Sequence, residues 1–241
     1  MGADVAIHGM RENGPAEYGE GSTLTAVAEE VAAAHGIRTL RVLGDLTLGA
    51  DIARVVETAT RELGPIDILV HNAGGDIAAR GGKPDPNDAI GIKEEDVRAV
   101  LDRNLLSTIL TCQAVAQQMM KRRHGRIVTI GSVAAFKGRT NGSIYAVAKA
   151  GMTHYTRCLA DQLRSYDINV NCIAPTFVRT EQVAAMLADP KFYEALTARI
   201  PLGRIAEPDE VMQAALFLVS SASNFITGQT IYLDGGITAT Q

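Results

Sequence analysis

Residues 65–70 constrain the fold most, because they form a near-continuous apolar run, Pro-Ile-Asp-Ile-Leu-Val. Such a run is typical of a parallel strand that is buried on both faces. Parallel sheets of this kind occur in α/β proteins, where helices cover the two faces. The small residues that follow in 71–75 allow a ligand to approach the backbone at the carboxyl end of the strand. The sequence therefore predicts an α/β fold with a ligand site at this edge of the sheet.

Further strands and helices alternate along the chain. Apolar runs predict strands at 2–9, 39–43, 126–132, 168–175 and 229–233. Helical periodicity, capping residues and glycine stops predict helices at 24–34, 50–63, 94–123, 144–163 and 208–220. We expect a single Rossmann-like domain over 1–241, because the 241 residues are 46% hydrophobic and can bury one sizeable core.

Charge and cysteine content exclude several classes of function. The net charge is -4 with both signs interspersed, which does not favour nucleic acid or an anionic membrane as a partner. Cys112, Cys158 and Cys172 are far apart and lack the spacing of a metal site, so they are interpreted as reduced core thiols. With neither an apolar run of membrane-spanning length nor an export signal, we expect a soluble, cytoplasmic protein.

The segment 143–152 carries the residues with the clearest chemical use. On a helix, Tyr145 and Lys149 lie one turn apart on the same face. A neighbouring cation favours the phenolate and lowers the pKa of a tyrosine, which makes it usable as a general acid or base. Ser132, at the end of a predicted strand, supplies a hydroxyl that can hold a substrate oxygen. The alternative is an ordinary packed tyrosine, because Tyr-x-x-x-Lys alone is common.

A series of motifs in order resembles the short-chain dehydrogenase/reductase family, and most closely its 3-oxoacyl-carrier-protein reductase branch. The resemblance covers nearly the whole chain from Gly2. It rests on the following residues: Asn72-Ala73-Gly74, Asn104, Ser132, Tyr145, Lys149, Ala174-Pro175, Thr180 and the segment 226–236.

The resemblance implies a reaction and a role for each catalytic residue. A nicotinamide cofactor would deliver hydride to a carbonyl carbon while Tyr145 protonates the oxygen. Lys149 would lower the pKa of Tyr145 and bind the nicotinamide ribose, and Ser132 would position the oxygen. Asn104 would hold a water that extends the proton relay, or it is a surface asparagine inside a helix.

The resemblance also implies the cofactor contacts. Val178 and Thr180 would meet the nicotinamide carboxamide and Lys149 the nicotinamide ribose. The further cofactor contacts would come from Asn72, Ala73, Gly74, Pro175 and Tyr145. Asp45 and the following Leu46 would lie at the adenine, unless Asp45 caps the next helix. Arg11 suits the 2'-phosphate of NADP, which gives a weak preference for NADP over NAD, unless it is an ordinary surface arginine.

Three features of the sequence depart from the family pattern. His71 stands where the family usually has asparagine, and we interpret it as a hydrogen-bonded support. Thr176 replaces the glycine that usually follows Pro175, so a tight glycine turn is lost. The first strand of the family and its Gly-rich turn have no counterpart before residues 2–9, and Gly14, Gly19 and Gly21 lie in a polar loop at 12–22 that does not replace the turn.

That missing unit leads to a structural expectation. The first strand normally pairs on both sides, so its loss would leave two rows of buried peptide groups unsatisfied. We predict that the strands close up, with residues 5–8 pairing directly against 66–71. A vacant groove, a partner chain in the groove, or a start codon placed too far downstream are the alternatives.

The remaining expectations concern the active-site mouth and assembly. The polar loop 76–93 borders the mouth, and the amphipathic stretch 181–200 is either a lid over the substrate or a pair of packed helices. The resemblance implies a homotetramer or homodimer and a small carbonyl or alcohol substrate. The alternative function is a truncated, cofactor-deficient homologue that is folded and oligomeric but catalytically silent.

Overall fold

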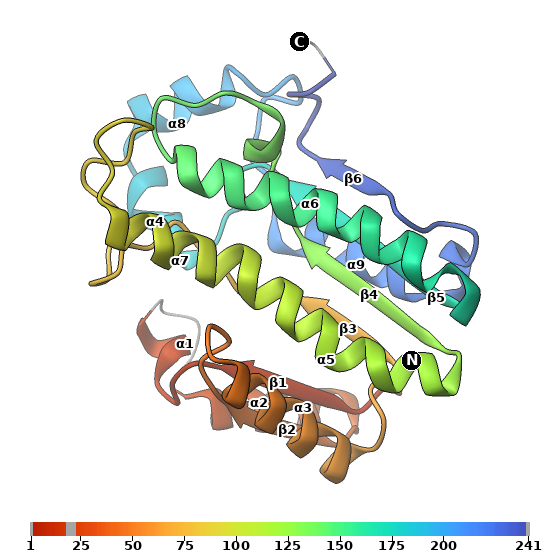
Figure 1. Ribbon diagram of the computed structural model, residues 1–241. Coiled ribbons are helices and arrows are strands. Elements are labelled where there is room, and N and C mark those ends of the chain that lie inside the picture. The colour runs from red at the N-terminus through yellow and green to blue at the C-terminus, as the bar shows by residue number, and fades with distance from the viewer. Residues whose placement is uncertain (1, 18–22, 240–241) are drawn as a thin grey trace.

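The computed structural model describes residues 2–17 and 23–239, and it has the predicted α/β architecture of parallel strands flanked by helices (Figure 1). The strands are β1 (Val5–Gly9), β2 (Thr39–Leu43), β3 (Ile68–His71), β4 (Gly125–Ile130), β5 (Ile168–Pro175) and β6 (Thr230–Leu233). The α-helices are α1 (Gly14–Glu17), α2 (Leu24–His35), α3 (Gly49–Leu63), α4 (Glu94–Leu101), α5 (Ser107–Arg122), α6 (Ser143–Leu163), α7 (Glu181–Leu187), α8 (Pro190–Thr197) and α9 (Pro208–Val219). A π-helical segment, η1 (Asp102–Leu106), joins α4 to α5.

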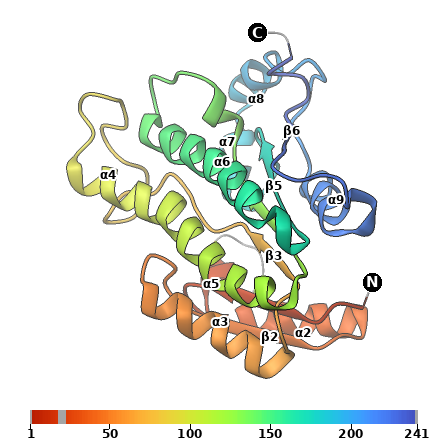
Figure 2. The ribbon, with the colours of Figure 1, turned by 45° about the vertical axis from the view of Figure 1, so that its right-hand side comes forward.

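Strand pairing divides these strands into two parallel sheets. One sheet has the order β1-β2 and the other has the order β3-β4-β5-β6. Helices α5 and α6 run side by side over one face of the larger sheet, and α9 covers its other face (Figures 1 and 2). The core follows this layering, since Ile127 and Val170 pack with α5 and α6 whereas Val128 and Ile173 pack with α9.

The predicted closure of the sheet is wrong. Among the described residues, β1 pairs only with β2 and β3 pairs only with β4, so segments 5–8 and 66–71 do not pair with each other. Residues 65–70 are also not buried on both faces, because Ile68 is 39% exposed and Val70 is 45% exposed.

Contacts between helices explain why the two sheets stay apart. Helix α3 packs against α5, and Gln118 of α5 connects them by donating to the Thr60 hydroxyl at 3.2 Å. The amide oxygen of Gln118 also accepts a hydrogen bond from the Ile66 backbone N–H at 3.0 Å, just before β3. Through α5, these bonds join α3, which packs on the β1-β2 unit, to the start of β3, and they support the observed spacing between that unit and β3.

Local sequence signals explain the helix limits. The hydroxyl of Thr23 accepts from the Ala26 N–H at 3.0 Å and caps α2, which ends at Gly36 in the left-handed conformation. The polar segment 12–22 is a short helix in part, because Gly14 begins α1, whereas Gly19 and Gly21 lie outside the described residues. The stretch 181–200 forms two helices, α7 and α8, separated at Asp189, whose carboxylate caps α8.

Candidate active site

Tyr145 and Lys149 lie on one face of α6, as the spacing predicts. The Lys149 Nζ is 5.6 Å from the centroid of the Tyr145 ring, and it donates a hydrogen bond to the Ile130 backbone oxygen at 2.8 Å. Because Ile130 ends β4, this bond holds the lysine at the carboxyl end of the sheet. Lys149 is 4% exposed, and burial lowers its pKa to about 8.

Ser132 stands beside the same tyrosine. It follows β4 by two residues and caps a 3-10 turn, η2 (Val133–Phe136), by accepting from the Ala134 N–H at 3.1 Å. Its hydroxyl is also near enough to the phenol of Tyr145 to lower the pKa of that phenol. The structure therefore brings Ser132, Tyr145 and Lys149 together, with a hydroxyl and an ammonium next to one phenol.

The expected direction of the Tyr145 pKa is corrected by the structure. We expected the lysine to lower it, but the pKa of Tyr145 is raised, with burial as the largest cause. The physical reason is the placement of Lys149: its ammonium lies over the aromatic ring and bonds the Ile130 oxygen, so it does not contact the hydroxyl. In this arrangement the phenol holds its proton, which suits a general acid.

Asn104 is a buried structural link and not a surface residue. It lies in η1 with 0% exposure. Its Oδ1 accepts from the Gly75 N–H at 2.9 Å, and its Nδ2 donates to the backbone oxygens of Gly75 and Val100 at 2.8 and 2.9 Å. The predicted helix over 94–123 is interrupted at Asn104 by this π-helical segment, which departs from the regular helical ladder and is of a kind common at functional sites.

Gly74 lies against Asn104 and Lys149, and its lack of a side chain leaves room for both. Its φ of +152° is a conformation that side-chain-bearing residues rarely adopt. A Cβ there would lie 2.6 Å from Asn104 Oδ1 and 3.4 Å from Lys149 Nζ. Asn72 and Ala73 precede it directly after β3, at the carboxyl end of the strand as predicted.

His71 is a buried support at the end of β3. Its Nδ1 lies 3.3 Å from the Thr108 hydroxyl, which itself donates to the Asn104 backbone oxygen at 2.6 Å. Burial first, and then the charge of Lys149, lower the pKa of His71 to about 4. The predicted hydrogen-bonded support is therefore confirmed on one side of the ring, while Nε2 has no partner among the described residues.

Three predicted cofactor residues belong to the β1-β2 unit. Arg11 and Asp45 each lie two residues beyond the paired strand ends Gly9 and Leu43, and Leu46 follows. Asp45 does not cap α3, because its Oδ1 accepts from the backbone and hydroxyl of Thr47 while the α3 cap position is Leu48.

The other predicted cofactor residues follow β5. Pro175 pairs with Leu233 of β6, and Val178 forms an isolated bridge with Ala206. Thr176 replaces glycine without strain, since it is not among the residues with positive φ.

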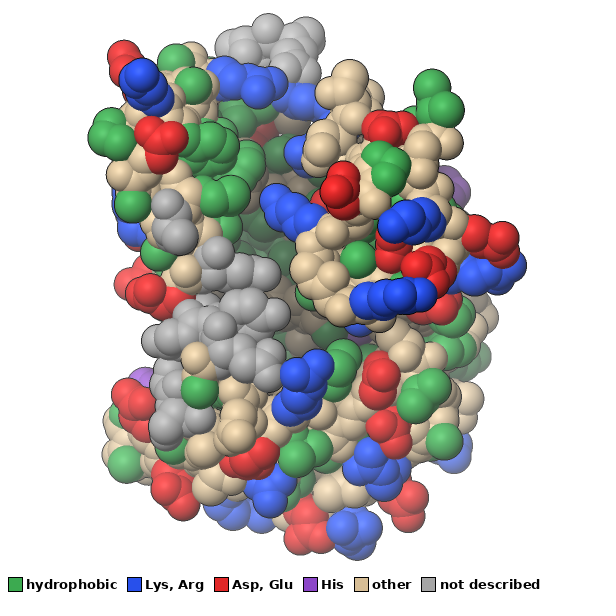
Figure 3. Space-filling view, turned by 90° about the vertical axis from the view of Figure 1, so that its left-hand side faces the viewer, with side chains coloured by type: hydrophobic (Ala, Val, Ile, Leu, Met, Phe, Trp, Pro, Cys, Tyr) green, Lys and Arg blue, Asp and Glu red, His purple; other side chains and the backbone are tan. Residues whose placement is uncertain are grey.

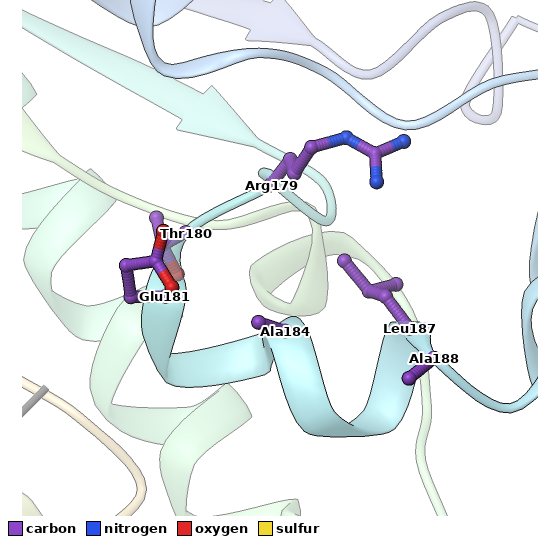
Figure 4. A pocket seen from close by; sticks show the side chains of 6 residues that line it. All are labelled: Arg179, Thr180, Glu181, Ala184, Leu187 and Ala188. Atoms are coloured by element: carbon purple, nitrogen blue, oxygen red, sulfur yellow. The ribbon is translucent and has the colours of Figure 1, made fainter. Parts of the chain in front are cut away.

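Thr180 begins α7 and lines a pocket of about 340 Å³ (Figure 4). In that view the pocket is bordered by Arg179, Thr180, Glu181, Ala184, Leu187 and Ala188. Glu181, Ala184 and Leu187 belong to α7, which is part of the segment 181–200 expected to form a lid or a pair of packed helices. Figure 3 shows the side of the molecule that carries α4 and α7, which is hollowed and has Lys and Arg side chains on its rim.

Sequence reasoning missed two charged residues near Tyr145. Asp76 raises the pKa of the phenol and Arg139 lowers it, after the larger effects of burial and Ser132. Asp76 directly follows the glycines after β3, and Arg139 lies in the short connection from Ser132 to α6. The closeness of Asp76 to Gly74 and of Arg139 to Ser132 in the sequence was the signal that could have identified them.

The described part of the chain has neither a candidate metal site nor a membrane-spanning helix. In residues 2–17 and 23–239, His, Cys, Asp and Glu form no group of three that could hold a metal ion. Within the same residues, no helix has both the length and the hydrophobicity needed to cross a bilayer.

Comparisons with known proteins agree with this geometry. Residues 2–238 match the family model described as Enoyl-(Acyl carrier protein) reductase. The chain is 34% identical over 245 residues to cyclohexanol dehydrogenase of Rhodococcus sp. (strain TK6), covering 98% of this chain and 87% of that protein. It is 36% identical over 193 residues to 3-oxoacyl-[acyl-carrier-protein] reductase FabG of Escherichia coli (strain K12), covering 80% and 75%.

A solved structure shows the same fold. Gluconate 5-dehydrogenase from Burkholderia cenocepacia J2315, in complex with NADP and tartrate, superimposes with a TM-score of 0.83 at 29% identity. The alignment covers 98% of this chain and 86% of that one.

Proposed function

The chain belongs to the short-chain dehydrogenase/reductase family of enzymes, which act on CH–OH donors with NAD(P), and we propose that it interconverts a ketone and a secondary alcohol with Tyr145 as the general acid and base. The observation that carries the proposal is the placement of Ser132 and Lys149 around the buried phenol of Tyr145.

Each residue has a separate task in the reduction. Ser132 donates a hydrogen bond to the substrate oxygen and holds it next to the Tyr145 hydroxyl. Tyr145 transfers its proton to that oxygen, and in the reverse direction it takes the proton from the alcohol. Lys149 stays fixed by the Ile130 oxygen, and Asn104 supports the proton supply from the lysine side.

The residues at the carboxyl end of the larger sheet fit the nicotinamide part of a cofactor. Gly74 allows the backbone after β3 to lie against Asn104 and Lys149, and the buried Lys149 ammonium has two donor protons beyond its bond to Ile130. Asn72, Ala73, Pro175, Val178 and Thr180 would complete this part of the site. When bound, the cofactor supplies or accepts the hydride.

The preference for NADP is carried by Arg11. Its side chain is exposed two residues after β1, where a guanidinium suits a 2'-phosphate. Asp45 and Leu46 would lie at the adenine.

A second candidate function has a specific observation in its favour. The facing edges of β1 and β3 are unpaired in the described residues, and Ile68 and Val70 on β3 are exposed. These unpaired edges support the alternative of a cofactor-deficient homologue. Such a protein would be folded and oligomeric but catalytically silent.

The proposal extends to assembly, location and substrate. The outer face of α5 and α6 carries a groove of about 320 Å³ with Met120, Tyr155 and Leu159 in its lining, which supports contact with another copy in a homodimer or homotetramer. We place the protein in the cytoplasm, with a small carbonyl or alcohol compound as substrate and with neither nucleic acid nor membrane as a partner.

Calorimetric titration with NADPH and NADH distinguishes the two candidate functions. The oxidoreductase proposal predicts heat of binding, a raised melting temperature and tighter binding of NADPH. It also predicts consumption of NADPH with at least one member of a panel of a cyclic ketone, a 3-oxoacyl thioester and a keto acid. Absence of heat, of a thermal shift and of turnover would select the silent homologue.

A further inference from the structure

Asp76 lies against the first turn of α6, the helix that carries Tyr145. Its Oδ2 accepts a hydrogen bond from the Asn87 side-chain amide at 2.7 Å. The backbone oxygen of Asn87 in turn accepts from the Gly142 N–H at 2.8 Å, directly before the helix. Asn87 is 6% exposed, so this connection between loop 76–93 and α6 is shielded from water.

Gly142 marks the point where the loop, the helix and a second charge meet. A Cβ at this glycine would lie 3.3 Å from Asp76 Oδ2 and 4.0 Å from the guanidinium carbon of Arg139. The two charges of opposite sign therefore lie close to the same backbone position, three residues before Tyr145. No hydrogen bond or ion pair joins them in the described residues.

The carboxylate of Asp76 is only partly neutralised. Its Oδ1 is buried without a hydrogen-bond partner in the described part of the chain, as is the hydroxyl of Ser143 at the start of α6. One donor for two oxygens leaves much of the negative charge to act on its surroundings, and burial weakens screening by solvent. The negative charge of Asp76 therefore acts on the phenol of Tyr145.

We propose that Asp76, held by Asn87 against the first turn of α6 and opposed by Arg139, is a positioning residue that keeps the reacting proton on Tyr145. The inference rests on the proposed role of Tyr145 as general acid. A nearby carboxylate disfavours the phenolate and a nearby guanidinium favours it, so Asp76 raises the pKa of Tyr145 and Arg139 lowers it.

The other groups that face the phenol act differently. The hydroxyl of Ser132 lowers the pKa of Tyr145, and Lys149 lies over the ring one turn along α6. His71 faces Lys149 from the end of β3 and is neutral near pH 7, since its pKa is lowered to about 4. Asp76 and Arg139 are thus the two charged groups of opposite sign that shift the pKa of Tyr145 in opposite directions.

Three variants test the proposal. Asp76→Asn keeps the shape and the acceptor for Asn87 but removes the charge, and Arg139→Gln removes the opposing charge. Asp88→Asn is the matched control, because Asp88 lies in the same loop and accepts from the Ile90 and Gly91 backbones. We expect the alkaline limb of kcat/KM for ketone reduction to move down by about 0.5 to 1 pH unit in Asp76→Asn. It should move up in Arg139→Gln and stay in place in Asp88→Asn.

A direct titration keeps the test independent of turnover. The phenolate absorbance of the full-length protein minus that of the same protein with Tyr145→Phe isolates this tyrosine from the other five. The midpoint should shift in the same directions as the kinetic limb, with circular dichroism recorded at each pH to confirm the fold.

The outcomes separate this inference from the proposed function. If Asp76→Asn lowers activity equally at every pH, or leaves both midpoints where Asp88→Asn leaves them, Asp76 is only structural and the inference is overturned. If the midpoints shift as expected but no carbonyl compound is reduced, the influence of Asp76 stands and the oxidoreductase proposal fails.

Discussion

The side chain of Asn104 and the backbone of Gly75 exchange two hydrogen bonds, of 2.9 and 2.8 Å, across 29 positions of the sequence. This pair fastens the turn after β3 to the π-helical segment between α4 and α5. It also explains why glycine occupies position 74, since that residue lies against the same amide oxygen.

Gly74→Ala should disturb this pair. The added Cβ would meet Asn104 Oδ1 at 2.6 Å in a backbone conformation that alanine rarely adopts. We expect a loss of about 1 to 3 kcal/mol in the free energy of unfolding and a larger loss of turnover, measured by urea unfolding and by NADPH oxidation. Gly138→Ala is the control, because nothing lies within 4 Å of its Cβ position; equal effects of the two substitutions would contradict the prediction.

Tyr145→Phe should abolish turnover and leave the fold intact, because it removes only the hydroxyl that transfers the proton. A loss of at least about 10²-fold in kcat is expected for a general acid, with an unchanged circular dichroism spectrum. Tyr155→Phe removes a hydroxyl from the same helix that bonds the Ile109 backbone oxygen at 3.3 Å, and it should keep its activity. Comparable rates for the wild type and Tyr145→Phe would refute the assigned acid.

His71→Asn should make the protein less sensitive to acid. The pKa of His71 is about 4 in the folded chain and near 6.5 when unfolded, so between these values the unfolded state binds more protons. The stability of the wild type therefore falls as the pH drops from 6.5 toward 4, by about 1 to 2 kcal/mol at pH 5.

Asparagine does not titrate, so this part of the loss should be absent in the variant. Urea unfolding at pH 7 and pH 5 measures the difference, and parallel losses in both proteins would show that His71 does not contribute.

Lys149→Met should remove a gain of stability at alkaline pH. The pKa of Lys149 is about 8 in the folded chain and 10.5 when unfolded, so the unfolded state binds more protons between these values. The wild type should gain on the order of 1 to 2 kcal/mol relative to the variant between pH 8 and 9.5. Urea unfolding at both pH values tests this, and a constant difference between the two proteins would count against a buried, titrating Lys149.

The sequence predicted the α/β class, the limits of most helices and the pairing of Tyr145 with Lys149, because these depend on local periodicity and spacing. The placement of Ser132 beside them was implied by the family resemblance. The direction of the Tyr145 pKa was not predictable in this way. It depends on burial and on where the Lys149 ammonium binds, and both follow from how α6 packs on β4.

The pairing of β1 and the charges around Tyr145 were also out of reach. Strand closure was argued from the need to satisfy peptide groups, but the packing of α3 on α5 decides the spacing. Asp76 and Arg139 come from two different loops, and only the fold shows that both approach Gly142.

The separation of β1-β2 from the larger sheet has a consequence for cooperativity. In the part of the chain that the structure describes, the two sheets share no ladder of hydrogen bonds, and side-chain contacts such as Gln118 with Thr60 join them. Regions joined in this way open as separate units with different free energies. The amides of Val5–Gly9 and Thr39–Leu43 should exchange with deuterium well before those of β4 and β5. The β1-β2 unit should therefore unfold before the larger sheet does.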